Sequence, residues 1–185
     1  ITRIVLKVEA PESATTVQTS IPKDAVNNAL KSGISSLTIS TPAGNVTFDS
    51  DTLSGLSEEA EGNLKITITR VEASSLSPEA LRIIGDRPVY DITVNGGSKE
   101  ISRFEGEVTV SVPYTPKEGE DINAIVIYYI NASGEPEVVT NGIYNPETGM
   151  VTFTTRHFSL YGVGYNKISF KDVAESAWYS KAVTF

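Results

Sequence analysis

The segment Leu64-Lys65-Ile66-Thr67-Ile68-Thr69-Arg70-Val71 decides the fold class, because apolar and polar side chains alternate strictly from Lys65 to Thr69. Successive side chains of a β-strand point to opposite faces, so this pattern predicts a half-buried strand. Turn-forming clusters such as Asn95-Gly96-Gly97 separate it from its neighbours. Ten further segments have strand-like patterns: residues 3–9, 16–21, 36–40, 45–48, 89–94, 107–112, 124–130, 137–140, 150–155 and 158–163. This many short strands predict a mainly β, sandwich-like module.

Three short helices are expected between the strands, at residues 23–32, 51–61 and 78–84. The third has the clearest ends, because Ser77 can cap it, Pro78 takes its first position and Gly85 follows its last. Pro22 is expected to be the first residue of the first helix, and Gly62 to end the second.

The run Ala124-Ile125-Val126-Ile127-Tyr128-Tyr129-Ile130 is apolar on both faces. We therefore expect a strand that is covered on both sides or lies centrally in its sheet. The two tyrosines could also stack on a sugar. However, adjacent strand residues point to opposite faces, so their rings cannot form one flat platform. Packing in the core or at its rim is the expected role of this pair.

The composition is that of an ordinary folded protein, with 185 residues, 39% of them hydrophobic and 21% charged. The formal net charge is −8 and the 15 basic residues are scattered singly, which argues against nucleic acid and anionic membrane surfaces as partners. No run of about 18 apolar residues occurs, so membrane insertion is not expected. The sequence lacks cysteine, which excludes disulfides and thiolate chemistry. It opens at Ile1 without a leader, as a mature or excised fragment would.

The pattern of the sequence changes near residue 166. Residues 1–165 are expected to form the β-rich module, either as one unit or as two subdomains that divide near residue 97. Residues 166–185 are expected to be a linker and the start of a helical unit, because Trp178, Ala182 and Phe185 fall at helical spacing after Ser176.

The end of the chain, Phe170-Lys171-Asp172-Val173-Ala174-Glu175-Ser176-Ala177-Trp178-Tyr179-Ser180-Lys181-Ala182-Val183, resembles the opening of an S-layer homology repeat. That family's pattern of Phe-x-Asp-Val, Trp-Tyr and Ala-Val is matched by Phe170, Asp172, Val173, Trp178, Tyr179, Ala182 and Val183. The resemblance implies the first helix of a truncated all-α repeat, on a protein of the bacterial cell surface. It also implies anchoring to cell-wall polysaccharide through complete downstream repeats. The alternative is a linker that ends in an amphipathic helix.

A second resemblance covers residues 101–165. Three segments are similar to segments that precede such repeats in bacterial surface proteins and polysaccharidases: Val108-Thr109-Val110-Ser111-Val112-Pro113-Tyr114, Ile127-Tyr128-Tyr129 and Val151-Thr152-Phe153-Thr154-Thr155-Arg156-His157-Phe158-Ser159. This resemblance implies an extracellular location rather than an activity. The expected function is a non-catalytic spacer or interaction module without a cofactor, with other surface proteins or polysaccharide as partners. A carbohydrate-binding module is the alternative.

The tripeptide His157-Phe158-Ser159 resembles the self-cleavage site of certain nucleoporins and death-domain adaptors. In that chemistry His157 would be the base, Ser159 the nucleophile and the Phe158 carbonyl the electrophile. The apolar positions change from odd at Val151 and Phe153 to even at Phe158, which predicts a bulge between residues 154 and 158. A bulge is also a common structural feature, so packing of His157 is the expected role and a self-cleaving domain is the alternative.

Three other groups of residues have ordinary structural explanations. Asn145-Pro146 could cleave through its side-chain amide, but it occurs in a common turn sequence. Two acidic groups, Asp49/Asp51 and Glu118/Glu120/Asp121, lack the glycine and glutamate positions of a calcium loop. Solvated charge is expected at both, and no metal site is predicted.

Overall fold

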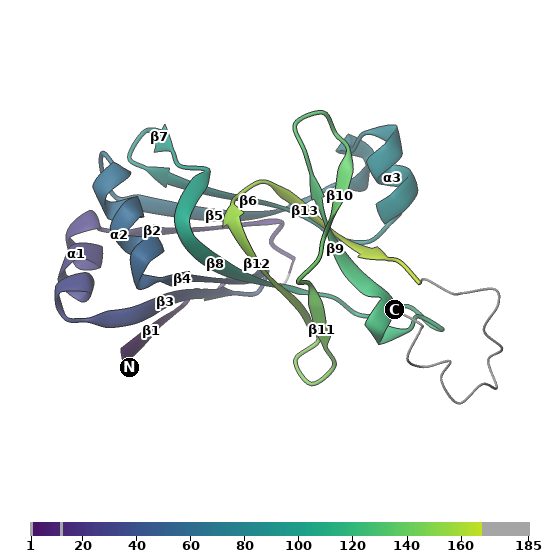
Figure 1. Cartoon of the computed structure of the whole chain (residues 1–185), viewed down its shortest axis with the longest axis horizontal. Coiled ribbons are helices and arrows are strands. Elements are labelled where there is room, and N and C mark those ends of the chain that lie inside the picture. The colour runs from purple at the N-terminus through teal and green to yellow at the C-terminus, as the bar shows by residue number, and fades with distance from the viewer. Residues whose placement is uncertain (1, 12, 168–185) are drawn as a thin grey trace.

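The computed structural model describes residues 2–11 and 13–167, which form a mainly β structure with two sheets and three short helices (Figure 1). The predicted fold class is therefore confirmed for this part of the chain. Sheet A has the strand order β1 (Thr2–Lys7), β3 (Ile34–Thr41), β4 (Gly44–Asp49), β8 (Arg103–Pro113), β12 (Met150–His157) and β11 (Ile143–Asn145). Sheet B has the order β10 (Pro136–Val139), β9 (Ile125–Ile130), β13 (Leu160–Tyr165), β6 (Val89–Gly96), β5 (Leu64–Val71) and β2 (Thr16–Ile21), and β7 (Lys99–Glu100) pairs with β6.

Both sheets contain strands from both halves of the chain, and along each strand order the strands of one half are grouped on one side and meet those of the other half. In sheet A, β4 pairs with β8, and in sheet B, β6 pairs with β13. The main hydrophobic cluster likewise draws buried side chains from both sides of residue 97. A division near residue 97 therefore does not separate two cores.

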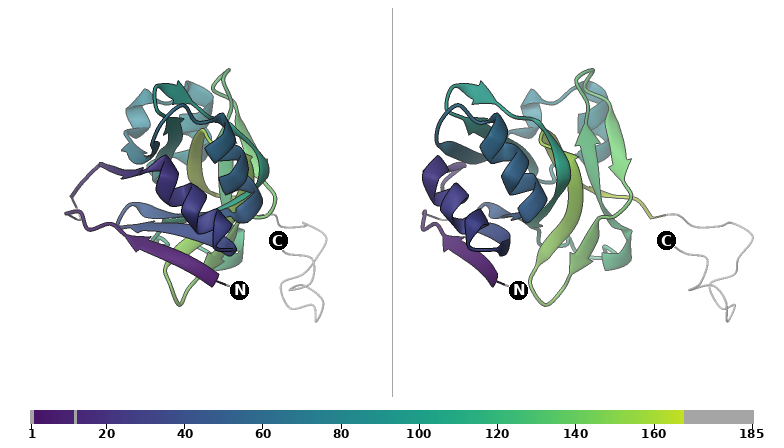
Figure 2. Two further views of the ribbon diagram at one scale, coloured as in Figure 1. Left: turned by 90° about the vertical axis from the view of Figure 1, so that its left-hand side faces the viewer. Right: turned by 60° about the vertical axis from the view of Figure 1, so that its left-hand side comes forward.

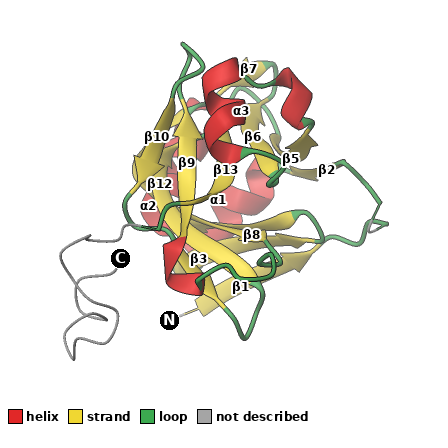
Figure 3. Ribbon diagram, turned by 90° about the vertical axis from the view of Figure 1, so that its right-hand side faces the viewer, coloured by secondary structure: helices red, strands yellow, loops and turns green. Residues whose placement is uncertain are grey.

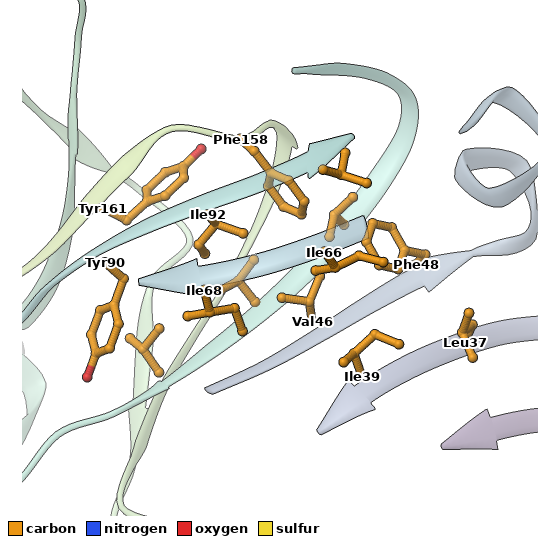
Figure 4. Packing of buried hydrophobic residues seen from close by; sticks show 14 of the residues in the cluster. Leu37, Ile39, Val46, Phe48, Ile66, Ile68, Tyr90, Ile92, Phe158 and Tyr161 are labelled. Carbon is orange, nitrogen blue, oxygen red and sulfur yellow. The ribbon is translucent and has the colours of Figure 1, made fainter. Parts of the chain in front are cut away.

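The core lies between the inner faces of the two sheets, as in other β-sandwiches. Figure 4 shows Val46 and Phe48 of β4 facing Ile66 and Ile68 of β5. These four side chains are almost fully buried. The strict alternation around Lys65–Thr69 thus has the predicted cause, because every second side chain of β5 enters the core.

The helices close the open sides of the sandwich. Helices α1 (Lys23–Lys31) and α2 (Ser50–Glu59) lie side by side at one end, and bury Val26, Leu53 and Leu56 against the sheets (Figure 2). Helix α3 (Pro78–Ile84) packs on the outer face of sheet B beside β13 (Figure 3). Two short 3₁₀ turns, η1 (Ala73–Ser75) and η2 (Ile122–Ala124), complete the elements. None of the helices in the described part of the chain is long and apolar enough to cross a membrane.

The predicted helix ends are correct for α3 and shifted for the other two helices. The Ser77 hydroxyl accepts a hydrogen bond from the Ala80 amide at 3.1 Å, and Gly85 follows the helix with a positive φ of 67°. Pro22 is the residue before α1 rather than its first helical residue, because its ψ of 133° is extended. Helix α2 ends at Glu59, before Gly62.

Strand β9 is covered on both faces, as its apolar run predicts. Tyr128 is buried in a small cluster with Ala80 and Ile84 of α3. Tyr129 points to the opposite face, where its ring centroid lies 4.6 Å from that of His157. The tyrosine pair is therefore packing on two faces and forms no common platform.

Two strands were not predicted, and several others begin at a different residue than expected, as β8 does at Arg103 instead of residue 107. The short strands β7 and β11 add edges to the sheets, and β13 begins at Leu160 instead of residue 158. The predicted bulge is present, because the register between β12 and β8 shifts between Thr155 and His157. After the bulge the chain leaves sheet A and enters sheet B. Phe158 is in the main core, but on β13 the odd positions Tyr161 and Val163 face that core and Leu160 packs in the outer cluster with α3, so the predicted change to even positions does not continue into β13.

Candidate functional site

One recess is lined by Tyr90, which lies at the end of the core away from Leu37 (Figure 4). Its volume is about 330 Å³. It brings together three distant segments, namely the end of β5, the residues around the start of β6, and the end of β8 with the loop that follows. We name it the Arg70 pocket; the lining includes Arg70, Arg87, Tyr90, Pro113, Tyr114 and Lys117.

Arg70 is placed by the alternation of β5. It follows Ile66 and Ile68 in the row of side chains that face inward. Its cross-strand partner is Tyr90, and directly opposed residues share a face of the sheet. Tyr90 is buried, and its hydroxyl donates to the Pro113 carbonyl at 3.0 Å, which links the two sheets. Arg70 therefore lies at the mouth between the sheets, where its side chain is exposed.

A network around Glu120 forms the adjoining wall. Arg87 Nε donates to Glu120 at 3.1 Å, and the Tyr114 hydroxyl donates to the same carboxylate at 2.6 Å. The backbone amide of Lys117 donates to it at 3.0 Å. The Arg87 guanidinium also lies 5.6 Å from the ring centroid of Tyr165. Arg87 also donates to Glu120 through Nη2, so hydrogen bonds from three residues to one carboxylate hold the loop after β8 in place.

The electrostatics of this network follow from its burial and hydrogen bonds. Burial raises the pKa of Tyr114 to about 12, and the hydrogen bond to Glu120 acts in the same direction. Burial alone would raise the pKa of Glu120, but hydrogen bonds from Tyr114 and Arg87 outweigh it and lower this pKa. Burial also raises the pKa of Tyr90. At neutral pH the wall therefore carries an ionised carboxylate and two neutral tyrosines.

Solvated charge was the wrong expectation for Glu120, whose side chain is only 7% exposed. Asp49 is also structural, because its carboxylate accepts from the Thr52 amide at 2.7 Å and caps α2. Asp121 accepts from the Asn123 amide at 3.0 Å in η2. Within residues 2–11 and 13–167, no group of three or more His, Asp or Glu side chains could hold a metal ion.

A second recess of about 360 Å³ lies between α2 and the start of β8. Leu56, Ile101 and Phe104 form its apolar part, and its charged lining consists of Glu58, Glu59, Glu105 and Arg103. Glu59 is paired with Lys99 at 2.7 Å, and among the described residues these carboxylates form no group that could hold a metal ion, so the recess indicates no particular ligand.

The residues of the His157-Phe158-Ser159 tripeptide lie where the chain crosses from sheet A to sheet B. Phe158 is buried, with its ring centroid 4.8 Å from that of Phe104 in an edge-to-face contact. The His157 ring contacts the Tyr161 hydroxyl through Nδ1 at 3.1 Å. Among the hydrogen bonds of the described residues, none joins this ring to the Ser159 hydroxyl.

The environment of His157 disfavours its charged form. Partial burial lowers its pKa, the nearby Arg103 acts in the same direction, and Glu137 opposes them. The ring is therefore a neutral packing group near pH 7, with Tyr129 and Tyr161 as its aromatic neighbours.

The other predicted site residues fall outside the described part of the chain: Phe170, Asp172, Val173, Trp178, Tyr179, Ala182 and Val183. The Arg70 pocket itself was not predicted from the sequence. One signal for it was available, because Arg70 breaks the apolar row of Leu64, Ile66 and Ile68 on the inward face of a strand.

Comparison with known proteins gives no family and a partial match to one bacterial protein. No family model matches the chain. The chain is similar to a protein of Evansella cellulosilytica named "Putative membrane protein", with 28% identity over 75 residues. The match covers 40% of this chain and 11% of that protein, so the chain spans about a tenth of the length of the relative that it matches.

Proposed function

We propose that residues 1–165 form a non-catalytic extracellular module that separates other parts of a bacterial surface protein beside its cell-wall anchor. One observation carries this proposal: the N-terminus at the start of β1 lies on the left of Figure 1, whereas the yellow end of the described chain after β13 lies on its right. A chain that enters at one end and leaves at the other holds its flanking segments apart by the length of the module.

Two further observations support the proposal. The two sheets share one core, so the module is suited to act as a rigid body rather than as a flexible linker. The segment that resembles an S-layer homology repeat follows Lys167 directly in the sequence, so the anchor would adjoin the β13 end.

A sedimentation assay with purified cell walls tests the anchoring part of this proposal. We expect the 185-residue chain to stay in the supernatant, and the same chain extended by its natural downstream residues to sediment with the walls. Deletion of residues 1–165 from the extended protein should leave sedimentation unchanged. It should also make the segment that precedes the module less accessible to antibody on whole cells. Sedimentation of the 185-residue chain alone would contradict a pure spacer role.

A carbohydrate-binding module is the second candidate function. Every tyrosine in the described part of the chain is buried or half-buried, so an exposed stacking platform does not support it. The Arg70 pocket does, because it is a recess with aromatic, proline and charged lining.

A further inference from the structure

We propose that the Arg70 pocket binds one acidic sugar unit of a polysaccharide, whose carboxylate pairs with Arg70 and Lys117. The inference rests on the second candidate function and names its ligand class. It does not depend on the spacer role.

The charge of the pocket is opposite to that of the whole chain. The formal net charge of the chain is −8. Arg70, Arg87 and Lys117 line the pocket with Asp86, and Glu120 in the adjoining wall pairs with Arg87, so three positive groups stand against two negative ones. A recess with a net positive charge on an acidic protein favours an anionic ligand.

Arg70 is the cation most available to such a ligand. Arg87 is occupied by Glu120 and Tyr114, and its side chain is only 16% exposed. Arg70 is exposed, and among the described residues no acidic side chain forms an ion pair with it. Its guanidinium can therefore give two parallel hydrogen bonds to a carboxylate, the geometry that arginine prefers.

Lys117 is the second cation that a ligand can reach. It pairs with Asp86, but both side chains are largely in solvent, with exposures of 44% and 80%. Surface pairs of this kind contribute little stability, so a ligand carboxylate can replace Asp86 without a large penalty. The backbone of Lys117 is meanwhile fixed by its hydrogen bond to Glu120. The Lys117 ammonium is thus open to solvent, while the backbone that carries it is held in place.

The remaining lining suits a sugar ring better than a bare inorganic anion. Pro88 and Pro113 supply apolar surface, against which the C–H faces of a pyranose can pack. The Tyr90 hydroxyl already donates to Pro113, so its oxygen remains an acceptor for a sugar hydroxyl. The volume of about 330 Å³ is near the lower limit of ligand pockets, which corresponds to a single sugar unit.

Titrations of the ¹⁵N-labelled chain followed by NMR test this proposal. Galacturonate and glucuronate are the probes, and galactose, acetate and inorganic phosphate are the comparisons. We expect both uronates to bind with millimolar affinity and to shift the amide resonances of Arg70, Tyr90, Tyr114 and Lys117. Added salt should weaken this binding, because it screens the charges. Galactose, acetate and phosphate should each bind more weakly.

Arg70→Ala should weaken uronate binding by roughly tenfold or more, because a charge-assisted pair is lost. Arg82→Ala is the matched control, since Arg82 is an exposed arginine in the last turn of α3 and outside the pocket. Both variants should keep the wild-type circular dichroism and melting temperature.

Three results would overturn the proposal. Equal binding of galactose and galacturonate would show that the carboxylate is not recognised. Equal binding of acetate or phosphate would show a general anion site without sugar recognition. Unchanged uronate binding by Arg70→Ala would place the ligand elsewhere. None of these results affects the spacer role, which is tested separately by the wall sedimentation assay.

Discussion

The Tyr161 hydroxyl donates to the His157 carbonyl at 2.7 Å and lies 3.1 Å from Nδ1 of the same histidine. The Thr155 hydroxyl joins this group at 2.8 Å from the Tyr161 oxygen. One side chain of β13 in sheet B thus holds both the backbone and the ring of the last residue of β12 in sheet A. The contact gives the only histidine of the chain a structural role at this crossing.

We predict that the chain stays covalently intact at the Phe158–Ser159 bond. Cleavage needs a base aimed at the Ser159 hydroxyl and a distorted peptide. Instead, the amide of Phe158 donates to the Ser102 carbonyl at 2.9 Å, and the Ser159 carbonyl accepts from the Ile92 amide at 3.2 Å. Intact mass spectrometry after prolonged incubation should show one species. Two fragments that sum to the whole plus one water, and that disappear in Ser159→Ala, would be evidence of a self-processing domain.

A pair of glycine substitutions is predicted to have opposite effects on stability. Gly96 lies against the end of α2, and a Cβ there would be 2.4 Å from Cβ of Ala60 and 2.5 Å from its Cα. Because Ala60 has no flexible side chain that could move away, Gly96→Ala should lower the free energy of unfolding by about 2 kcal/mol or more. Gly55 in the middle of α2 has no atom within 4 Å of the added carbon. Gly55→Ala should therefore raise the free energy of unfolding by up to about 1 kcal/mol.

Urea unfolding of the two glycine variants measures both changes on one scale. The difference between the two changes in unfolding free energy is the decisive quantity, because both substitutions add one methyl group in or beside α2. If Gly96→Ala were as stable as the wild type, the close approach of β6 to Ala60 would be wrong.

Local patterns could be predicted from the sequence because their causes are local. The alternation of Lys65–Thr69 arises because one face of the strand is buried. The Ser77 cap depends on the Ala80 amide, which is only three residues away in the sequence. Strand β11 was missed because Ile143 is 69% exposed and the strand has three residues, so no alternation marks it. Its position comes from pairing with β12, which is a tertiary effect.

The Arg70 pocket could not be predicted for a related reason. The pocket contains Arg70, Tyr90 and Lys117, which come from three separate segments. Arg70 and Tyr90 are close because β5 pairs with β6. The segment of Lys117 is brought near them by the contact between the two sheets. Strand pairing over such distances depends on the whole core. A single sequence shows which faces are apolar, but not which strands become neighbours.

Loss of the Ser77 cap is predicted to destabilise helix α3, which packs on the outer face of sheet B. Ser77→Ala removes the acceptor of the Ala80 amide and the hydroxyl that donates to the Gly134 carbonyl. The free energy of unfolding should fall by about 1–2 kcal/mol, the usual cost of a lost N-cap. Ser133→Ala is the control, since Ser133 is exposed in a turn. Equal stability of both variants in urea would mean that the cap contributes nothing to the fold.

The acid sensitivity of the fold is predicted to depend on Glu120. Hydrogen bonds from Tyr114 and Arg87 hold its pKa below the usual value of 4.5 despite burial, which acts in the opposite direction. A carboxylate with a lowered folded pKa stabilises the native state above its unfolded pKa, and this contribution is lost as the pH falls through the folded pKa. At about pH 7, Glu120→Gln should therefore lower the free energy of unfolding by about 1.5–3 kcal/mol, the range for hydrogen bonds to charged groups. The difference from wild type should shrink steadily as the pH falls below about 4.5, and the exposed Glu118→Gln should show neither effect. Urea unfolding at a series of pH values provides the measurement, and a difference that stays constant with pH would mean that the Glu120 charge does not stabilise this wall.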